Sequence, residues 1–166
     1  LRMTGARGRE VAGLMKKLFE EKKLPEEEME ERLATLGRLQ EVVEEVFPGR
    51  QAQLQLFGSS VNGFGSRGAD MDMVLMVDDQ DLVGRLETRL EELKYEDMLA
   101  LPKARVPVVK FRDPATGLGC DICFNNELAL RNSRLLSTYA GLDSRLRPLA
   151  FSVKSWAKAR RVNNTF

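Results

Sequence analysis

The chain has 166 residues, of which 26 are basic and 25 acidic, so its formal net charge is +1. Hydrophobic residues make up 43 % of the sequence and charged residues 31 %, which argues against disorder and against a membrane protein. Histidine is absent, so a Ser-His-Asp or Cys-His nucleophile, a histidine base and His-ligated zinc are all excluded. Any catalysis must therefore use carboxylates, lysines, hydroxyl groups or metals bound by oxygen.

The first half of the chain is expected to begin with helices and then turn to strands. Apolar residues at helical spacing predict one helix over residues 11–19 and a second over 25–46. The alternating segment 53–57 predicts a half-buried strand. A glycine-rich loop over 58–68 then leads into a predicted strand over 70–77, which starts polar and ends apolar.

The second half continues the sheet and ends in helices. Residues 81–93 predict an amphipathic helix, and the segments 106–111 and 119–124 predict two strands. Turn residues over 113–117 connect these two segments, so the two strands are predicted to form a hairpin. From Asn126 onward the pattern is helical. The fold class is therefore α/β (α+β), a mixed sheet of about five strands flanked by helices.

Charge is distributed unevenly along the chain. Residues 25–45 carry eight acids and two bases, whereas residues 131–166 carry eight bases and one acid, Asp143, a local net charge of +7. Such a basic segment is a candidate site for phosphate or nucleic acid, and the alternative is a solvated helix face.

The two cysteines form a CxxC pair, Cys120 and Cys123, within the predicted strand 119–124. Strand residues three apart point to opposite faces, which opposes a disulfide between them. No second pair is present to complete a four-cysteine zinc site. We expect two buried, reduced thiols, as in a reducing compartment.

A glycine-serine turn precedes two aspartates that are two residues apart. Gly63–Gly68 matches GxGxxG, but it leads into a strand and not a helix, so it is not a dinucleotide fingerprint. Asp70 and Asp72 project from one face of the strand, and a divalent cation would relieve their repulsion. The turn residues Gly58 and Ser59, ahead of them, suit contact with a phosphate. The alternative is a solvent-exposed strand entry.

A third carboxylate, Asp121, interrupts the apolar strand 119–124, where an unpaired charge would be costly to bury. Three carboxylates on adjacent strands suit two-metal phosphoryl transfer, in which one Mg²⁺ or Mn²⁺ activates the attacking hydroxyl and the other holds the triphosphate. Lys154 and Lys158 share a helix face and are candidates to clamp the triphosphate, or else ordinary surface lysines.

Several motifs occur in a fixed order along the chain. They are Phe57-Gly58-Ser59-Ser60, Asp70-Met71-Asp72, Val106-Pro107-Val108-Val109-Lys110, Cys120-Asp121-Ile122-Cys123-Phe124-Asn125-Asn126, and the segment from Leu146-Arg147-Pro148 to Trp156-Ala157-Lys158. With these motifs, residues 54–163 resemble the Cid-like RNA uridylyltransferases and poly(A) polymerases, terminal nucleotidyltransferases of the polymerase-beta superfamily. The segment 105–163 is most similar to plant-type RNA uridylyltransferases.

The resemblance implies a nucleotidyltransferase palm and a role for each matching residue. Asp70, Asp72 and Asp121 match the family's catalytic metal triad, with Asp121 nearest the primer 3′-hydroxyl. Nucleotide-binding roles are implied for eight residues: Phe57, Gly58 and Ser59 on the phosphate side, Ala129, Asn132 and Ser133 at the ribose, and Lys154 and Lys158 on the base and phosphate sides. Lys103 and Arg105 either contact RNA or belong to a solvated loop.

The resemblance also implies a division of the chain. We expect N-terminal helices over 1–48 that pack on the central helical domain, the catalytic palm over 49–143, and the start of the helical central domain over 144–166. The sequence begins with Leu1 and stops before the loop that distinguishes uracil from adenine in this family. We therefore expect a piece of a longer chain.

The implied function is that of an RNA uridylyltransferase, which transfers UMP from UTP to RNA 3′ ends without a template, in RNA tail addition and turnover. One alternative is a poly(A) polymerase that uses ATP, and another is a catalytically inactive RNA-binding or interaction module. The complete aspartate triad argues against the inactive module. The expected partners are an RNA 3′ end and UTP, with no membrane, and the expected location is cytoplasmic.

Overall fold

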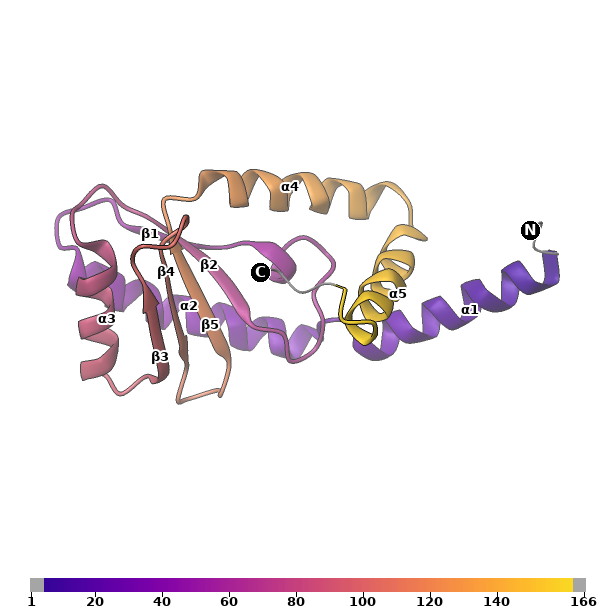
Figure 1. Ribbon diagram of the computed structural model, residues 1–166, viewed down its shortest axis with the longest axis horizontal. Helices are drawn as coiled ribbons and strands as arrows, with labels where there is room; N and C mark the ends of the chain where they lie inside the picture. The colour runs from indigo at the N-terminus through magenta and orange to yellow at the C-terminus, as the bar shows by residue number, and fades with distance from the viewer. Residues whose placement is uncertain (1–4, 163–166) are drawn as a thin grey trace.

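The computed structural model describes residues 5–162 of the chain, and Figure 1 shows their arrangement. The elements in chain order are α1 (Gly5–Lys22), α2 (Glu26–Val46), β1 (Gln53–Leu56), the 3₁₀ turn η1 (Gly58–Ser60), β2 (Met71–Met76), α3 (Leu82–Glu92), β3 (Glu96–Leu101), β4 (Val108–Arg112), β5 (Gly119–Phe124), α4 (Glu127–Leu142) and α5 (Leu146–Ala159). Among the described residues, no helix is both long and apolar enough to cross a membrane.

A five-stranded mixed sheet lies at the centre of the fold, with strand order β1-β2-β5-β4-β3. β2 and β5 run parallel, and the other neighbouring pairs are antiparallel. The predicted hairpin is β4–β5, and its turn is closed by the Asp113 N–H, which donates to Leu118 O at 2.9 Å. The predicted fold class is confirmed.

β3 is the strand that the sequence does not predict. It begins with two acids, Glu96 and Asp97, and contains no β-branched residue, so its local pattern lacks a strand signal. Pairing with β4 makes this segment a strand, because residues 99–101 pair with residues 108–110 in an antiparallel ladder. The register shifts between Glu96 and Leu99, where Asp97 has a φ of 52°, so the outer end of this edge strand is irregular.

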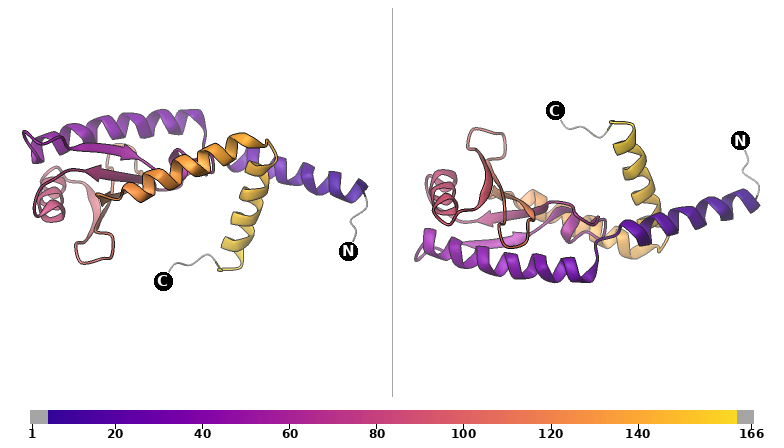
Figure 2. Two further views of the ribbon diagram at one scale, coloured as in Figure 1. Left: turned by 90° about the horizontal axis from the view of Figure 1, so that it is seen from above. Right: turned by 90° about the horizontal axis from the view of Figure 1, so that it is seen from below.

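The core fills one face of the sheet. Met71, Met73 and Leu75 of β2 are fully buried there, together with Leu39 of α2 and Leu86 of α3. Because side chains alternate along a strand, the residues between them on β2 point to the other face. Figure 2 shows α2 along one side of the sheet, with α5 projecting toward the opposite side. The face opposite the core is therefore the one that α5 approaches.

The N-terminal and C-terminal helices pack on each other beyond the end of the sheet (Figure 1). The rings of Phe19 on α1 and Phe151 on α5 meet edge to face, with centroids 5.0 Å apart. α2, which the sequence groups with α1 in the segment 1–48, instead packs its apolar stripe on the sheet. The boundaries predicted at residues 48 and 143 stay a prediction.

Candidate functional site

Two of the predicted carboxylates lie side by side on the open face of the sheet. Asp72 on β2 and Asp121 on β5 are direct partners in the parallel register. The flanking residues Met71 and Cys120 are fully buried in the core on the other face. The alternation predicted for both strands therefore places both carboxylates on one surface, although 49 positions separate them in the sequence.

Asp70 stands at the entrance to this surface, one residue before β2, and its side chain is exposed. A Cβ atom added to Gly119 would lie 2.4 Å from Asp70 Oδ1, so the Asp70 carboxylate rests against the start of β5. Within residues 5–162, no three Asp, Glu, Cys or His side chains are close enough together to hold a metal ion as they stand. The three aspartates share one region, and Asp70 must turn toward Asp72 and Asp121 to close a metal site.

Lys110 faces the carboxylates from the next strand. It is the register partner of Asp121, and its Nζ donates a hydrogen bond to Asp121 Oδ2 within an ion pair. Lys110 and Asp121 are 42 % and 24 % exposed, so solvent screens the pair in part. A row of Asp72, Asp121 and Lys110 therefore crosses three adjacent strands.

The electrostatics of Asp72 reflect this crowding. Burial raises the pKa of its carboxyl group most, and the negative charges of Asp121 and Asp70 raise the pKa further. Lys110 and Arg32 act in the opposite direction. Clustered carboxylates whose charged forms disfavour each other provide the oxygen donors that Mg²⁺ and Mn²⁺ prefer, so the residues fit a divalent metal.

The glycine-serine turn packs directly against Asp72. The Phe57 N–H donates to Asp72 O at 3.0 Å, and Gly58 follows with a φ of 63°. A Cβ atom on Gly58 would lie 2.7 Å from Asp72 Oδ2, so only glycine allows this approach. Ser59 comes next, half-buried at the first turn of η1. The structure thus brings the predicted phosphate turn next to the predicted metal ligands.

α4 reaches the same turn through Ser133. Its Oγ accepts a hydrogen bond from the Gly58 N–H at 2.8 Å and donates one to Ala129 O at 2.8 Å. Ser133 is 5 % exposed, whereas Asn132 beside it is exposed. Ser133 therefore holds the turn in place, and Asn132 is the residue of this pair that is free to meet a ligand.

The two predicted lysines of α5 face the loop that precedes β2. Lys154 and Lys158 line a pocket of about 450 Å³ whose opposite wall is the loop segment 66–69. Lys154 Nζ also donates to Phe64 O at 3.4 Å. The lining of this pocket includes Ala69, the residue before Asp70, but none of the three aspartates, so the structure does not bring the two lysines into contact with the carboxylates.

Three other predictions concern residues to which the site gives no direct role. Lys103 and Arg105 are exposed in the turn between β3 and β4, away from the described contacts of the carboxylates. Cys120 and Cys123 are free thiols on opposite faces of β5, as the strand alternation predicts. Gly63–Gly68 leads into β2 and opens no helix, in agreement with the rejection of a dinucleotide fingerprint.

The sequence carries a signal for Lys110 that parallels the one for Asp121. Each is the single charge within its predicted strand segment, 106–111 for Lys110 and 119–124 for Asp121, and the two residues are opposite each other in the sheet. Arg32 of α2, fully buried near the start of β2, has no comparable signal. It occurs among acids on a helix, where a base normally makes a surface ion pair.

Comparison with known proteins identifies relatives of this arrangement. A family model described as the central palm domain of mitochondrial-like poly(A) RNA polymerase matches residues 11–141. Poly(A) RNA polymerase GLD2 of Xenopus tropicalis is 37 % identical over 138 residues, which cover 77 % of this chain and 26 % of that protein. Terminal uridylyltransferase cid1 of Schizosaccharomyces pombe is 34 % identical over 162 residues, which cover 90 % of this chain and 38 % of that protein. The chain thus spans well under half the length of these relatives.

Solved structures give the same result. A cytoplasmic RNA terminal U-transferase has a TM-score of 0.84 and 32 % identity, over 94 % of this chain and 48 % of that one. The mtPAP structure in complex with UTP has a TM-score of 0.86 and 29 % identity, over 94 % of this chain and 38 % of that one. The predicted resemblance and the palm fold are both confirmed.

Proposed function

This chain belongs to the family of the mitochondrial-like poly(A) RNA polymerases, matched over their central palm domain, and on that premise we propose that the protein adds nucleotides to RNA 3′ ends without a template. The observation that carries the proposal is the parallel register of Asp72 and Asp121 on the open face of the sheet. A binding module has no use for carboxylates crowded side by side, and here burial together with the charges of Asp121 and Asp70 raises the pKa of Asp72, so this arrangement favours catalysis.

Each group of residues has a defined part in this proposal. Asp70, Asp72 and Asp121 hold Mg²⁺ or Mn²⁺, which when bound activates the RNA 3′-hydroxyl and neutralises the triphosphate. Ser59 donates hydrogen bonds to the outer phosphates from the turn beside Asp72. Lys154 and Lys158 supply positive charge from the opposite wall of their pocket.

The sugar and the primer are recognised by neighbouring side chains. Asn132, exposed on α4, reads the ribose hydroxyls, and Ser133 supports it by fixing the Gly58 turn. Lys110 keeps the Asp121 carboxylate oriented in the absence of substrate through their ion pair. When a metal ion binds, Lys110 competes with that ion for the same carboxylate. Asp121 is the carboxylate on the primer side.

We propose UTP as the favoured nucleotide, from the similarity of residues 105–163 to plant-type RNA uridylyltransferases. The alternative is ATP, since GLD2 carries the name of a poly(A) polymerase. The two free thiols agree with a reducing compartment, and we propose a cytoplasmic location.

The test is an incorporation assay with the complete protein that carries this chain. A short RNA primer is incubated with each nucleoside triphosphate in turn, with Mg²⁺ or Mn²⁺, and the products are resolved by length. We expect extension with UTP above extension with ATP. Extension by ATP alone overturns the UTP assignment, and no extension with any nucleotide overturns the proposed activity.

A further inference from the structure

A fully buried arginine of α2 lies beneath the site, on the core side of the sheet. Arg32 is 1 % exposed, and the side chain of Glu28, one helical turn earlier, is 14 % exposed. Arg32 Nη2 donates to Glu28 Oε1 at 2.8 Å. The pair is therefore an ion pair almost completely removed from solvent, at the start of a helix that otherwise presents an apolar stripe to the sheet.

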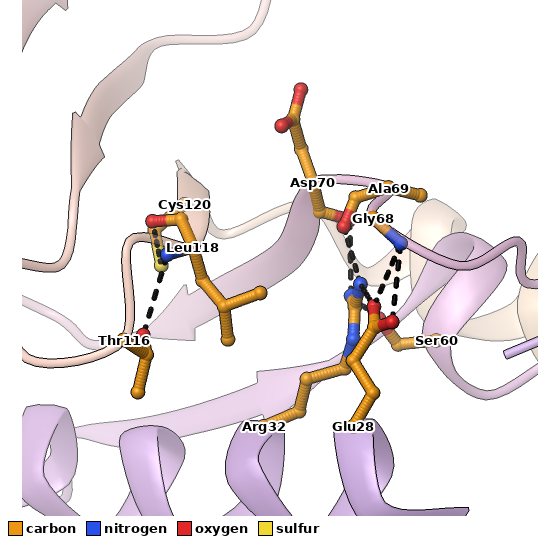
Figure 3. A network of polar contacts seen from close by, with 9 residues as sticks. All are labelled: Glu28, Arg32, Ser60, Gly68, Ala69, Asp70, Thr116, Leu118 and Cys120. Atoms are coloured by element: carbon orange, nitrogen blue, oxygen red, sulfur yellow. Dashed lines mark hydrogen bonds and ion pairs between the residues drawn. The ribbon is translucent and has the colours of Figure 1, made fainter. Parts of the chain in front are cut away.

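The Arg32 guanidinium connects the two segments that carry the predicted phosphate and metal contacts (Figure 3). Its Nη1 donates to Ser60 Oγ at 2.9 Å and to Asp70 O at 3.2 Å, and its Nη2 also donates to Ala69 O. Ser60 directly follows Ser59, and Asp70 is the first of the three aspartates. One side chain thus fixes the separation between the turn and the start of β2.

Glu28 completes the clamp from the same helix. Its two carboxylate oxygens each accept a hydrogen bond from the Gly68 N–H, at 3.1 Å. The backbone from residue 68 to residue 70 is therefore held by two side chains of α2. Figure 3 shows the Asp70 carboxylate pointing away from Arg32 while its carbonyl faces the guanidinium. The clamp therefore acts on the backbone of Asp70 and makes no hydrogen bond to its carboxylate.

Stability alone does not account for this arrangement. Removal of two charges from water is costly, and an apolar pair of similar volume is often at least as stable. The Nε of Arg32 has no hydrogen-bond partner among the described residues, so one buried donor goes unused. The loop that the clamp restrains contains Gly63, Gly65 and Gly68, and glycines give a chain conformational freedom that must be removed to fix Asp70.

We propose that Arg32 is a positioning residue, which sets the distance between the Ser59 turn and the Asp70 backbone and so prepares the site for a metal-bound nucleoside triphosphate. The inference rests on the proposed function. Arg32 touches neither metal nor nucleotide and acts through Ser60 and the peptide groups of residues 69 and 70. Partners in the outer shell of a metal site commonly change metal affinity or activity by about 10–100-fold when removed.

The test compares Arg32→Met with a matched control on the same helix, in the complete protein. Arg38 also binds a buried partner, Asp113, at 2.7 Å, but this contact anchors α2 to the β4–β5 turn and not to the site. The control is Arg38→Met. Three quantities are measured for each protein: the melting temperature, kcat and KM for the nucleotide, and the half-saturating Mn²⁺ concentration by electron paramagnetic resonance.

We expect both variants to lower the melting temperature. Arg32→Met should also lower kcat by roughly tenfold or more and raise the half-saturating Mn²⁺ concentration by roughly tenfold, because the two halves of the site are no longer held together. Arg38→Met should leave kcat and Mn²⁺ binding within about twofold of wild type, as expected for a site that it does not contact. Equal effects of the two variants on kcat and Mn²⁺ binding would overturn the inference.

A milder variant covers the case in which Arg32→Met does not fold. Ser60→Ala removes one acceptor of the clamp and should shift kcat and Mn²⁺ binding in the same direction, by a smaller factor. Unchanged values of both in Ser60→Ala would then contradict the inference. The Mn²⁺ titration separates the two proposals, because it needs no RNA. A wild-type protein that extends no primer refutes the proposed function. A shifted Mn²⁺ affinity in Arg32→Met or Ser60→Ala, but not in Arg38→Met, still supports the clamp.

Discussion

Replacement of Asp121 by asparagine should abolish nucleotide transfer and leave the fold intact. The substitution preserves size and removes the charge that lies beside Asp72 and is paired with Lys110. Neighbouring strands are about 4.8 Å apart, and two like charges at that separation repel by about 3 kcal/mol at an effective dielectric constant near 20. The lost ion pair with Lys110 is 42 % exposed on the lysine side and contributes at most about 1 kcal/mol after screening.

The balance of these terms predicts a metal-free variant that is more stable than wild type by about 2–3 kcal/mol. For a chain of this size the melting temperature should then rise by about 4–12 °C. Catalysis should change far more, because both the charge that develops on the attacking oxygen and its alignment depend on Asp121. A loss of at least about 4 kcal/mol, roughly a thousandfold in rate, is expected.

Single-turnover extension of an RNA primer, together with thermal melting in the presence and absence of Mg²⁺, measures both effects. Nucleotide binding should persist in the variant, since Asp70 and Asp72 remain. Extension at a near wild-type rate would refute the catalytic role of Asp121. A loss of activity that accompanies a lower melting temperature would refute the electrostatic reasoning, because the variant would then be inactive through unfolding.

Three further predictions follow from the geometry of individual residues. Asp72→Asn should raise the melting temperature of the metal-free protein at pH 7. Because folding raises the pKa of Asp72, its ionised carboxylate destabilises the wild-type protein above the folded pKa. The difference in melting temperature between the variant and wild type should therefore disappear as the pH falls below 3.8. Burial raises the pKa of the Cys120 thiol to about 12 and also raises that of Cys123, so a disulfide reagent should modify both only at the rate of unfolding. Ser59→Ala should weaken nucleotide binding by about 1.5–3 kcal/mol for each lost hydrogen bond to phosphate, measured as a higher KM; an unchanged KM would exclude the contact.

Most of the sheet could be predicted from the sequence because its strands carry strong local patterns. The apolar run of β2 and the single carboxylate in β5 identify both strands and the face that each presents. Their parallel register, which places Asp72 beside Asp121, is set by the chain path between them and not by either strand alone. The resemblance to a family predicts that the three aspartates meet, but it does not predict this register.

Other features depend on contacts between distant segments and leave no local pattern. β3 forms because β4 offers a ladder at the sheet edge, although its own sequence favours no strand. Ser133 looks like an ordinary helix residue, yet it holds Gly58, which lies 75 positions earlier. Arg32 is another such case, since its partners at residues 60, 69 and 70 meet it only in the folded chain.

The central claim is that the open face of the sheet at Asp72 and Asp121 is a metal-dependent nucleotidyl-transfer site. A crystal of the complete protein grown with Mn²⁺ and a non-hydrolysable UTP analogue tests it directly through the anomalous scattering of manganese. The account predicts anomalous peaks within ligand distance of the Asp72 and Asp121 carboxylates, roughly 2.0–2.2 Å for a metal of this type, with Asp70 turned toward them. Anomalous peaks elsewhere on the protein, with Lys110 still bound to Asp121, would contradict it.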